Sequence, residues 1–335
     1  MWWEPRSNDE IRMAEILPRL ERRYIAQYSS QFVLGVGSFF SQEGLRPLLL
    51  LNQMATEVLP PVPYVINIEL LPPTVFEQLR AWELPYDTMF FFVTPPEPVA
   101  ARFGARMGPG TAIRCKATKT RGTLAVAVAG KPGWLPVRGF LTVGHLAPLG
   151  CGSIIELIEV SRFGRTRYRS IGRVVECITP MISSGQPEYD AAIVKLLPLR
   201  QLGALPYRGL ARIRSPLTQP LLATLHGGVS GVVAPAALVG GLTAYGGPWG
   251  IWKNSWIVLP SGLISQGDSG GILVLDETKT VAGMIVGGSR VENSTVYMAQ
   301  YAHDMEALER DVLQPRGFRL TYHGSDLRRE CLWRL

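Results

Sequence analysis

Gly267-Asp268-Ser269-Gly270-Gly271 lies between two apolar segments, Trp256-Ile257-Val258-Leu259 and Ile272-Leu273-Val274-Leu275. Glycines on both sides of the acid and the serine allow a tight loop that holds one hydroxyl in the open. With average glycine usage, chance gives this string in a chain of 335 residues with a probability of roughly 10⁻⁴ to 10⁻³. The motif is therefore specific enough to predict a site built around the Ser269 hydroxyl.

A serine hydroxyl is a weak nucleophile until a base removes its proton, so the loop predicts a histidine and a carboxylate elsewhere. The chain has four histidines. His145 follows the apolar segment 139–144, and Asp190 precedes the apolar segment 191–196. The alternatives are a hydrogen-bonded interior histidine at 145, and Asp190 as a turn cap with Glu188 as the orienting acid. The two remaining histidines are interpreted as structural, namely His226 and His303.

At these three points the sequence resembles the trypsin/chymotrypsin-like serine proteases, over about residues 108 to 312. In that family the histidine follows a Leu-Thr-Ala-Ala-type strand, the aspartate heads an Asp-Ile-Ala-Leu-type strand, and the serine sits in this glycine-bracketed motif. The resemblance implies twin β-barrels with the triad in the cleft between them. It makes Ser269 the nucleophile, His145 the general base and Asp190 the acid that orients it, with the amides of Gly267 and Ser269 as the oxyanion hole.

The resemblance also implies a substrate class, a protein or peptide. In the family, the residue six before the nucleophile floors the primary specificity pocket, and that residue here is Leu263. The expected wall consists of Val286, Gly287, Gly288 and Thr295. An apolar floor cannot pair with Lys or Arg, and an unpaired buried cation is costly, so we expect cleavage after a medium or large apolar residue.

The means of activation is left open by the sequence. Secreted members of the family mature by a cut that frees an apolar N-terminus to pair with the acid before the serine, here Asp268, and no such cut site is evident before residue 110. A peptidase that stays latent until a regulatory protein partner binds is therefore one interpretation. A catalytically silent scaffold of the protease fold, binding an acidic protein or a nucleic acid, is the alternative from a different functional class.

The composition predicts a folded protein without a metal or an organic cofactor. Apolar residues make up 47% of the chain, which is long enough for two domains. The four cysteines show neither metal nor redox spacing, and no glycine-rich nucleotide loop is complete. Where secreted family members place disulfide cysteines, this chain has Leu146 and Ser265. Free thiols, the absence of a recognisable export signal and the lack of a membrane-spanning apolar run predict a cytoplasmic protein.

A change in the periodicity of apolar residues along the chain predicts the domain organisation. Segments with helical and strand periodicity alternate in residues 1–98, beginning with an amphipathic helix from Ser7 to about Tyr28, which predicts a small α+β module that regulates the enzyme or recognises substrate. The proline-rich segment 94–98 marks its end. Residues 108–312 carry short, evenly spaced strands typical of a β-barrel protein, and residues 313–335 form a tail. The predicted fold class is α+β overall and mainly β.

Positive charge gathers in one predicted strand. The net charge is +7, and its densest run comprises Arg162, Arg165, Arg167, Arg169 and Arg173. Because side chains alternate along a strand, the spacing of two predicts a solvated outer face, with an acidic-partner site as the alternative. A nucleic-acid partner is not favoured.

Overall fold

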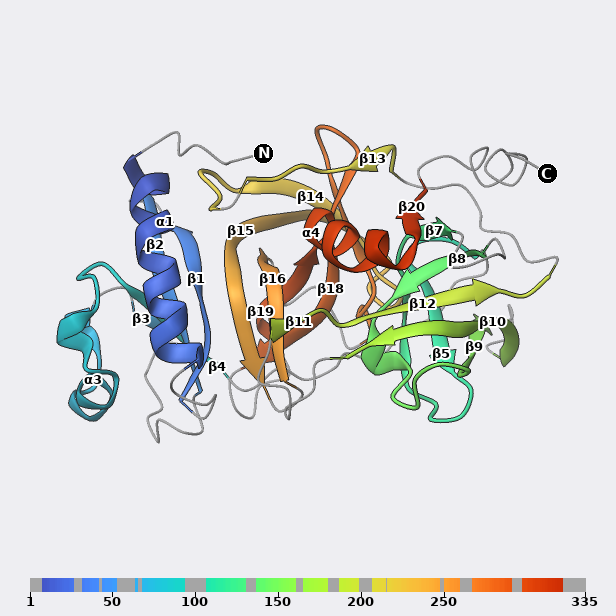
Figure 1. Cartoon of the computed structure of the whole chain (residues 1–335), viewed down its shortest axis with the longest axis horizontal. Helices are drawn as coiled ribbons and strands as arrows, with labels where there is room; N and C mark the ends of the chain where they lie inside the picture. The colour runs from blue at the N-terminus through green and yellow to red at the C-terminus, as the bar shows by residue number, and fades with distance from the viewer. Residues whose placement is uncertain are drawn as a thin grey trace.

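The computed structural model describes residues 8–26, 32–41, 44–52, 64–65, 68–93, 107–130, 137–160, 165–179, 187–198, 207–214, 216–247, 250–259, 267–290 and 297–321. Its strands form two sheets, of eight and twelve strands, which lie side by side with the N-terminal elements at one end of the molecule (Figure 1). Within the described residues, no helix is long and apolar enough to cross a membrane.

The eight-stranded sheet holds the segment that precedes His145. Its strands, in the order in which they pair, are β20 (Phe318–Leu320), β7 (Ala127–Gly130), β8 (Val137–Thr142), β12 (Ala191–Leu196), β10 (Thr166–Ile178), β9 (Ile154–Val160), β5 (Thr111–Cys115) and β6 (Arg121–Leu124). Backbone bonds from Ala125 to Leu141 (2.9 Å) and from Leu141 to Val126 (2.8 Å) join the β6–β7 connection to β8. The sheet therefore curls back on itself as a barrel.

The twelve-stranded sheet holds the serine motif. Six of its strands form a closed ring, because β15 pairs with both β14 and β16. These are β14 (Leu221–His226), β15 (Val232–Gly247), β16 (Gly250–Leu259), β19 (Tyr297–Asp304), β18 (Thr280–Arg290) and β17 (Ile272–Leu275), with β11 (Pro187–Glu188) and β13 (Gly209–Leu210) at its margins. The predicted pair of β-barrels is thus present, with His145 and Ser269 on different barrels.

The N-terminal strands continue the second sheet outward from β15. They are β1 (Val33–Ser41), β2 (Gly44–Asn52), β4 (Met89–Val93) and β3 (Tyr64–Val65), and β1 pairs with β15. Helix α1 (Asn8–Glu21) lies along β1 and β2 (Figure 1), and α3 (Pro73–Leu79) flanks the strands. The proline-rich boundary predicted at 94–98 lies outside the described residues, so the division at that point stays a prediction.

The predicted helix at the N-terminus is present as α1, and one of its faces is buried. Met13, Leu17 and Leu20 are buried, whereas Ile11 is 44% exposed. The buried positions follow the i, i+4, i+7 spacing of one helix face. After Glu21 the chain continues as a π-helix, η1 (Arg22–Ala26), and the predicted end of the helix near Tyr28 lies outside the described residues.

Three further short segments belong to the described structure. Residues 68–70, after β3, form a 3₁₀ turn, η2 (Ile68–Leu70). Ala125 and Val126 separate β6 from β7. After β19 the chain forms α4 (Met305–Leu308) followed by η7 (Glu309–Leu313).

The arginine run and the cysteines agree with the sequence interpretation where they are described. Arg165, Arg167, Arg169 and Arg173 are exposed, and Arg169 pairs with Glu159 at 2.8 Å. Arg162 and Cys331 lie outside the described residues. The other cysteines are free thiols, namely Cys115, Cys151 and Cys177.

Candidate active site

His145 and Asp190 meet at neighbouring ends of two paired strands. His145 lies in the turn η4 (Gly144–Leu146) just after β8, and Asp190 directly precedes β12, which pairs antiparallel with β8. The backbone N–H of His145 donates to Asp190 Oδ1 at 2.9 Å, and ring Nδ1 lies 2.5 Å from Oδ2. This contact places the imidazole proton on Nδ1 and leaves Nε2 with a lone pair, the form that a general base requires.

The residue before His145 has to be glycine for this contact to form. A Cβ at Gly144 would lie 2.3 Å from the carbonyl oxygen of Ile178 and 2.9 Å from Asp190 Oδ1. No side chain fits at that distance from backbone.

Asp190 is the acid that contacts His145, and it is kept charged. Burial of this 1% exposed residue would by itself raise its pKa, but the electrostatic interaction with His145 and the hydrogen bonds that its ring and backbone amide donate lower the pKa overall. The other candidate, Glu188, lies in β11 and pairs through its backbone with Trp252.

His303, interpreted from the sequence only as a structural histidine, contacts the backbone of Asp190. Its Nε2 accepts the backbone N–H of Asp190 at 2.8 Å, and Ser255 Oγ lies 3.4 Å from its Nδ1. His303 is fully buried, which lowers its pKa to about 4. It is therefore neutral at physiological pH, with its proton on Nδ1.

A second row of serine, histidine and aspartate, namely Ser255, His303 and Asp190, resembles a triad, but its hydrogen bonds run in the wrong direction for catalysis. His303 contacts the backbone amide of Asp190, whereas a triad histidine donates to the carboxylate. Because Nδ1 already carries the proton, it cannot remove one from Ser255. His303 thus positions Asp190, and His226, on β14, has its pKa lowered by burial alone.

The serine motif forms the tight loop that its glycines predict, just before β17. Gly267 and Gly270 have φ angles of +108° and +90°, a region that favours glycine. The amide of Gly271 donates to the carbonyl of Asp268 at 2.5 Å and closes the turn. The glycines on both sides of the serine are therefore required by the backbone.

Thr123, on β6, ties this loop to the first barrel. Its amide donates to the Ser269 carbonyl (2.7 Å), and its hydroxyl donates to the Gly267 carbonyl (2.7 Å). Its own carbonyl accepts the hydroxyl of Thr142, three residues before His145, at 2.8 Å. Thr123 thus joins the nucleophile loop to the strand that leads to His145. No sequence motif surrounds it, and only the three-dimensional fold reveals its role.

The Ser269 hydroxyl is not hydrogen bonded to His145 in this structure. Ser269 Oγ donates to the carbonyl of Val286 at 3.3 Å, and Ser269 is fully buried. Nε2 of His145 is also buried and has no hydrogen-bond partner. Nε2 of His145 is thus available to accept a hydrogen bond, but the Ser269 hydroxyl is directed at the Val286 carbonyl instead.

Two further features of the loop bear on its chemistry. Among the described residues, none accepts a hydrogen bond from the amide of Gly267, the first predicted oxyanion donor. The Asp268 carboxylate accepts hydrogen bonds from the amides of Val229 (2.9 Å) and Ser230 (3.1 Å) and from the Ser230 hydroxyl (2.5 Å). A turn of the chain itself therefore holds the acid that the family's secreted members pair with a new N-terminus.

Only part of the predicted wall of the specificity pocket lies within the described residues. Val286, Gly287 and Gly288 lie on β18, beside the nucleophile loop, while Leu263 and Thr295 lie outside the described residues. A Cβ at Gly288 would lie 2.6 Å from the side-chain oxygen of Gln300, so the Gln300 amide covers Gly288. Both polar atoms of that amide are buried without a hydrogen-bond partner. The wall is therefore partly polar.

No group of three or more His, Cys, Asp or Glu side chains able to hold a metal ion occurs within the described ranges.

Comparison with protein-family models finds no match, and comparison with curated proteins finds none either. Solved structures similar to the chain include serine proteases. An alpha-lytic protease homolog, N4, is 16% identical and has a TM-score of 0.39, covering 65% of this chain and 100% of its own. The active form of the Rv3671c protease from M. tuberculosis is 15% identical, with a TM-score of 0.33 and coverages of 64% and 91%. Neuropsin, from mouse brain, is 15% identical, with a TM-score of 0.37 and coverages of 63% and 96%.

Proposed function

We propose that the chain is a serine endopeptidase of the trypsin/chymotrypsin-like type. The observation that carries this proposal is the doubly hydrogen-bonded pair of His145 and Asp190, with Nε2 of His145 left as an acceptor. The glycine-bracketed serine loop, fastened through Thr123 to the strand that leads to His145, adds the nucleophile. These features supply a base, an acid that orients it and a hydroxyl.

In the proposed reaction, Ser269 Oγ attacks the carbonyl carbon of a peptide bond while His145 Nε2 takes the hydroxyl proton. Asp190 stabilises the imidazolium that forms, and the amides of Gly267 and Ser269 face the developing oxyanion. His145 then gives the proton to the leaving amine, and water hydrolyses the acyl-enzyme through the same groups in reverse.

The state described here is proposed to be a latent one. Ser269 must turn its hydroxyl from the Val286 carbonyl toward His145, and substrate must reach a serine that is now fully buried. A partner or substrate that opens this region would permit both changes. The Asp268 contacts with residues 229–230 support activation without a freed N-terminus, because the acid is already hydrogen bonded.

For substrates we propose cleavage after a medium or large apolar residue, the class expected from Leu263 as the floor of the pocket. The Gln300 amide beside Gly288, whose nitrogen and oxygen are both without a partner, can donate and accept hydrogen bonds but carries no negative charge to pair with Lys or Arg. A peptide library in which cleavage follows Arg or Lys would contradict this assignment.

Free thiols support the proposal that the enzyme works in a reducing compartment, as the cytoplasm is. The thiol of Cys177 has its pKa raised to about 11, chiefly by burial, which makes it unreactive at neutral pH.

The turned Ser269 hydroxyl favours one alternative, a silent scaffold of the same fold that binds an acidic partner. A fluorophosphonate probe separates the two functions, since it reacts only with an activated serine. We expect purified protein, or protein supplied with lysate as a source of the activating partner, to be labelled at Ser269 and the Ser269→Ala variant to remain unlabelled. Ser255→Ala is the matched control and should still label. Absence of labelling under both conditions would favour the scaffold.

A further inference from the structure

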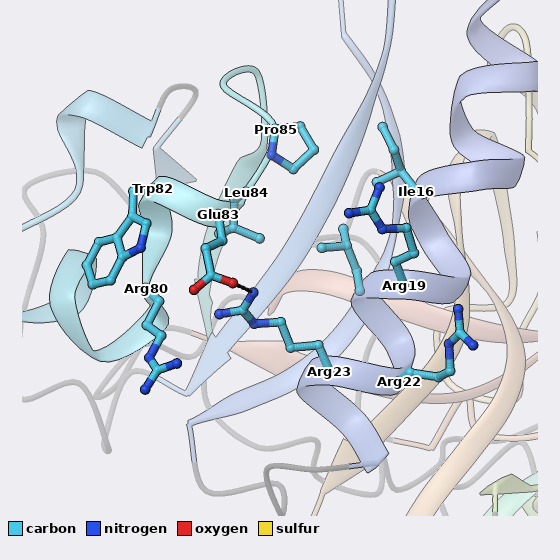
Figure 2. Close-up of a pocket in the computed structure, with 10 residues that line it drawn as sticks. Ile16, Arg19, Arg22, Arg23, Arg80, Trp82, Glu83, Leu84 and Pro85 are labelled. Carbon is cyan, nitrogen blue, oxygen red and sulfur yellow. Dashed lines mark hydrogen bonds and ion pairs between the residues drawn. The ribbon is translucent and has the colours of Figure 1, made fainter.

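A pocket of about 730 Å³ lies in the N-terminal part of the chain, between the end of α1 and the turn that follows α3 (Figure 2). A volume of this size is typical of ligand sites. Arginines from both walls line it, together with one tryptophan and one acid: Arg19, Arg22, Arg23, Arg80, Trp82 and Glu83. None of these residues belongs to the predicted active site.

One carboxylate of the chain itself, that of Glu83, is already bound in the pocket. Arg23, from the helical side, forms an ion pair with Glu83 from the opposite wall (Figure 2). The hydrogen bond from Arg23 and the charges of Arg23 and Arg80 lower the pKa of Glu83. Four arginines and one acid line the pocket, and Glu83 forms its ion pair with Arg23, so three positive charges are left over.

The remaining arginines have few internal partners. Arg22 donates through Nε to the carbonyl of Pro18 at 3.2 Å, which leaves its two terminal nitrogens. Within the described residues, no acceptor or acid lies within bonding distance of Arg19 or Arg80. Neutralising the C-terminal end of a helix explains cations near the end of α1 in general, but it does not explain an arginine on the facing wall.

Arg80 occupies a backbone position that favours glycine. Its φ and ψ are 48° and 55°, in the left-handed region at the end of α3. A residue with a side chain in this conformation is destabilised by roughly 1 kcal/mol relative to an unstrained one. An arginine here does not serve the turn, and its guanidinium adds to the charge of the pocket.

Trp82 supplies a flat apolar surface at the mouth of the pocket. It is 57% exposed, and its ring lies 6.0 Å from that of Phe76 at a tilt of 45°. Ile16 and Leu84 extend the apolar lining. A ligand that combines negative charge with an apolar group would satisfy both parts of the pocket.

We propose that this pocket binds an acidic peptide segment of a partner protein, with carboxylates on Arg19, Arg22 and Arg80 and an apolar side chain against Trp82. A carboxylate already lies on Arg23, which favours a peptide acid as the ligand. Single-stranded nucleic acids use several stacking aromatic residues along a groove, whereas a single exposed tryptophan lines this compact pocket. The binding does not depend on peptidase activity.

The test uses the full chain carrying Ser269→Ala, so that no hydrolysis can interfere. Fluorescence anisotropy measures binding of a labelled peptide with four glutamates around one phenylalanine, and of the same peptide with glutamines. We expect the acidic peptide to bind, the glutamine peptide to bind at least tenfold more weakly, and added salt to weaken the binding. Equal binding of the two peptides, or no binding, would overturn the proposal, as would tighter binding of an oligothymidylate or of inorganic phosphate.

Arg80→Gly is the informative variant, because its effects on binding and on stability have opposite directions. Affinity should fall about tenfold, whereas stability in urea should stay the same or rise, since glycine suits this φ angle. Lys279→Gly is the matched control: it also has a positive φ (55°) and removes one exposed positive charge, but outside the pocket. Equal weakening by both variants would show attraction by net charge alone and would reject the site. Arg19→Gln, expected to weaken binding similarly, checks the helical wall.

Discussion

The two halves of the candidate active site differ in how completely they are assembled. On the first barrel, Asp190 is fixed by His145 on one side and by His303 on the other. On the second barrel, hydrogen bonds from Thr123 hold the backbone of the serine loop, but the Ser269 hydroxyl donates to the carbonyl of Val286. The pair of His145 and Asp190 has the geometry that the proposed mechanism needs, whereas the Ser269 hydroxyl would have to rotate toward His145.

Under the proposed peptidase function, this difference identifies the step that activation would have to change. Rotation about one side-chain bond is intrinsically fast, so the proposed barrier to activity lies in the contacts that cover Ser269 rather than in the backbone of the loop. Because Thr123 bonds to the loop on both sides of Asp268, the backbone position of the nucleophile is shared with the first barrel. Variants can therefore test each half separately.

The largest effect is expected from breaking the base half with Asp190→Asn. An amide cannot hold the proton on Nδ1 of His145 or stabilise the imidazolium, and such a change lowers the rate of a serine triad by about 10⁴-fold. The measurement is the rate of peptide hydrolysis, or of fluorophosphonate labelling, by the activated protein. Asp276→Asn is the control, since Asp276 bonds to Thr224 (2.6 Å) away from the site. A loss below tenfold would show that Asp190 does not serve His145.

The second effect concerns pH and the histidine behind Asp190. Burial lowers the pKa of His303 to about 4, below its value of about 6.5 in an unfolded chain. The unfolded state therefore takes up a proton first as the pH falls, so the free energy of unfolding should decrease by about 3 kcal/mol between pH 6.5 and 4. Above pH 6.5 this group has no effect on stability.

His303→Gln isolates that contribution, because glutamine keeps an acceptor near the amide of Asp190 but does not titrate. Asp304, whose pKa is raised to about 6 by burial, has the opposite effect and gains stability as the pH falls below 6. The difference between wild type and His303→Gln, followed by urea unfolding at each pH, cancels the Asp304 contribution. Parallel curves for the two proteins would contradict the assignment of His303 as a buried neutral acceptor.

The sequence predicts those site residues that lie within a short, recognisable pattern of neighbouring residues. The glycines of the serine motif, the apolar strand before His145 and the acid at the head of 191–196 are local patterns, and each can be recognised in the sequence alone. The rotation of Ser269 and the position of His303 depend on contacts between residues more than a hundred positions apart or on neighbouring strands, for which a single sequence carries no signal. Thr123 is the clearest case, because an ordinary strand threonine gives no hint that it bridges two barrels.

The N-terminal region shows the same limit at the level of the fold. Its helix and three of its strands were predictable from apolar periodicity and length. Its pairing with β15 was not, because β15 is a run of 16 residues that contains four glycines and one proline, a composition that weakens strand signals. The sequence alone therefore does not show the surface with which β1 pairs.

A third variant, Thr123→Val, should loosen the nucleophile half and leave the base half intact. It removes the hydroxyl bond to the Gly267 carbonyl and the bond that the hydroxyl accepts from the Gly228 amide (3.0 Å), and both groups are buried. Unpaired buried groups of this kind lower the free energy of unfolding by about 2 kcal/mol. Thr278→Val, at an exposed turn, should change it by less than about 0.5 kcal/mol. Urea unfolding measures both, and similar values would show that Thr123 fills space without holding the loop.

The smallest expected effect comes from Gln300→Leu, and it has the opposite sign. Both polar atoms of the Gln300 amide are buried without a partner, so an apolar side chain of similar size should raise the free energy of unfolding by about 1 kcal/mol. Gln314→Leu, at an exposed position, is the matched control and should leave stability nearly unchanged. A buried amide that destabilises the resting fold is consistent with a group that finds its partner in bound substrate, since Gln300 covers Gly288 on the predicted specificity wall. Gln300→Leu should therefore also shift hydrolysis toward purely apolar residues, and a variant that is less stable than wild type would show that the amide is satisfied in solution.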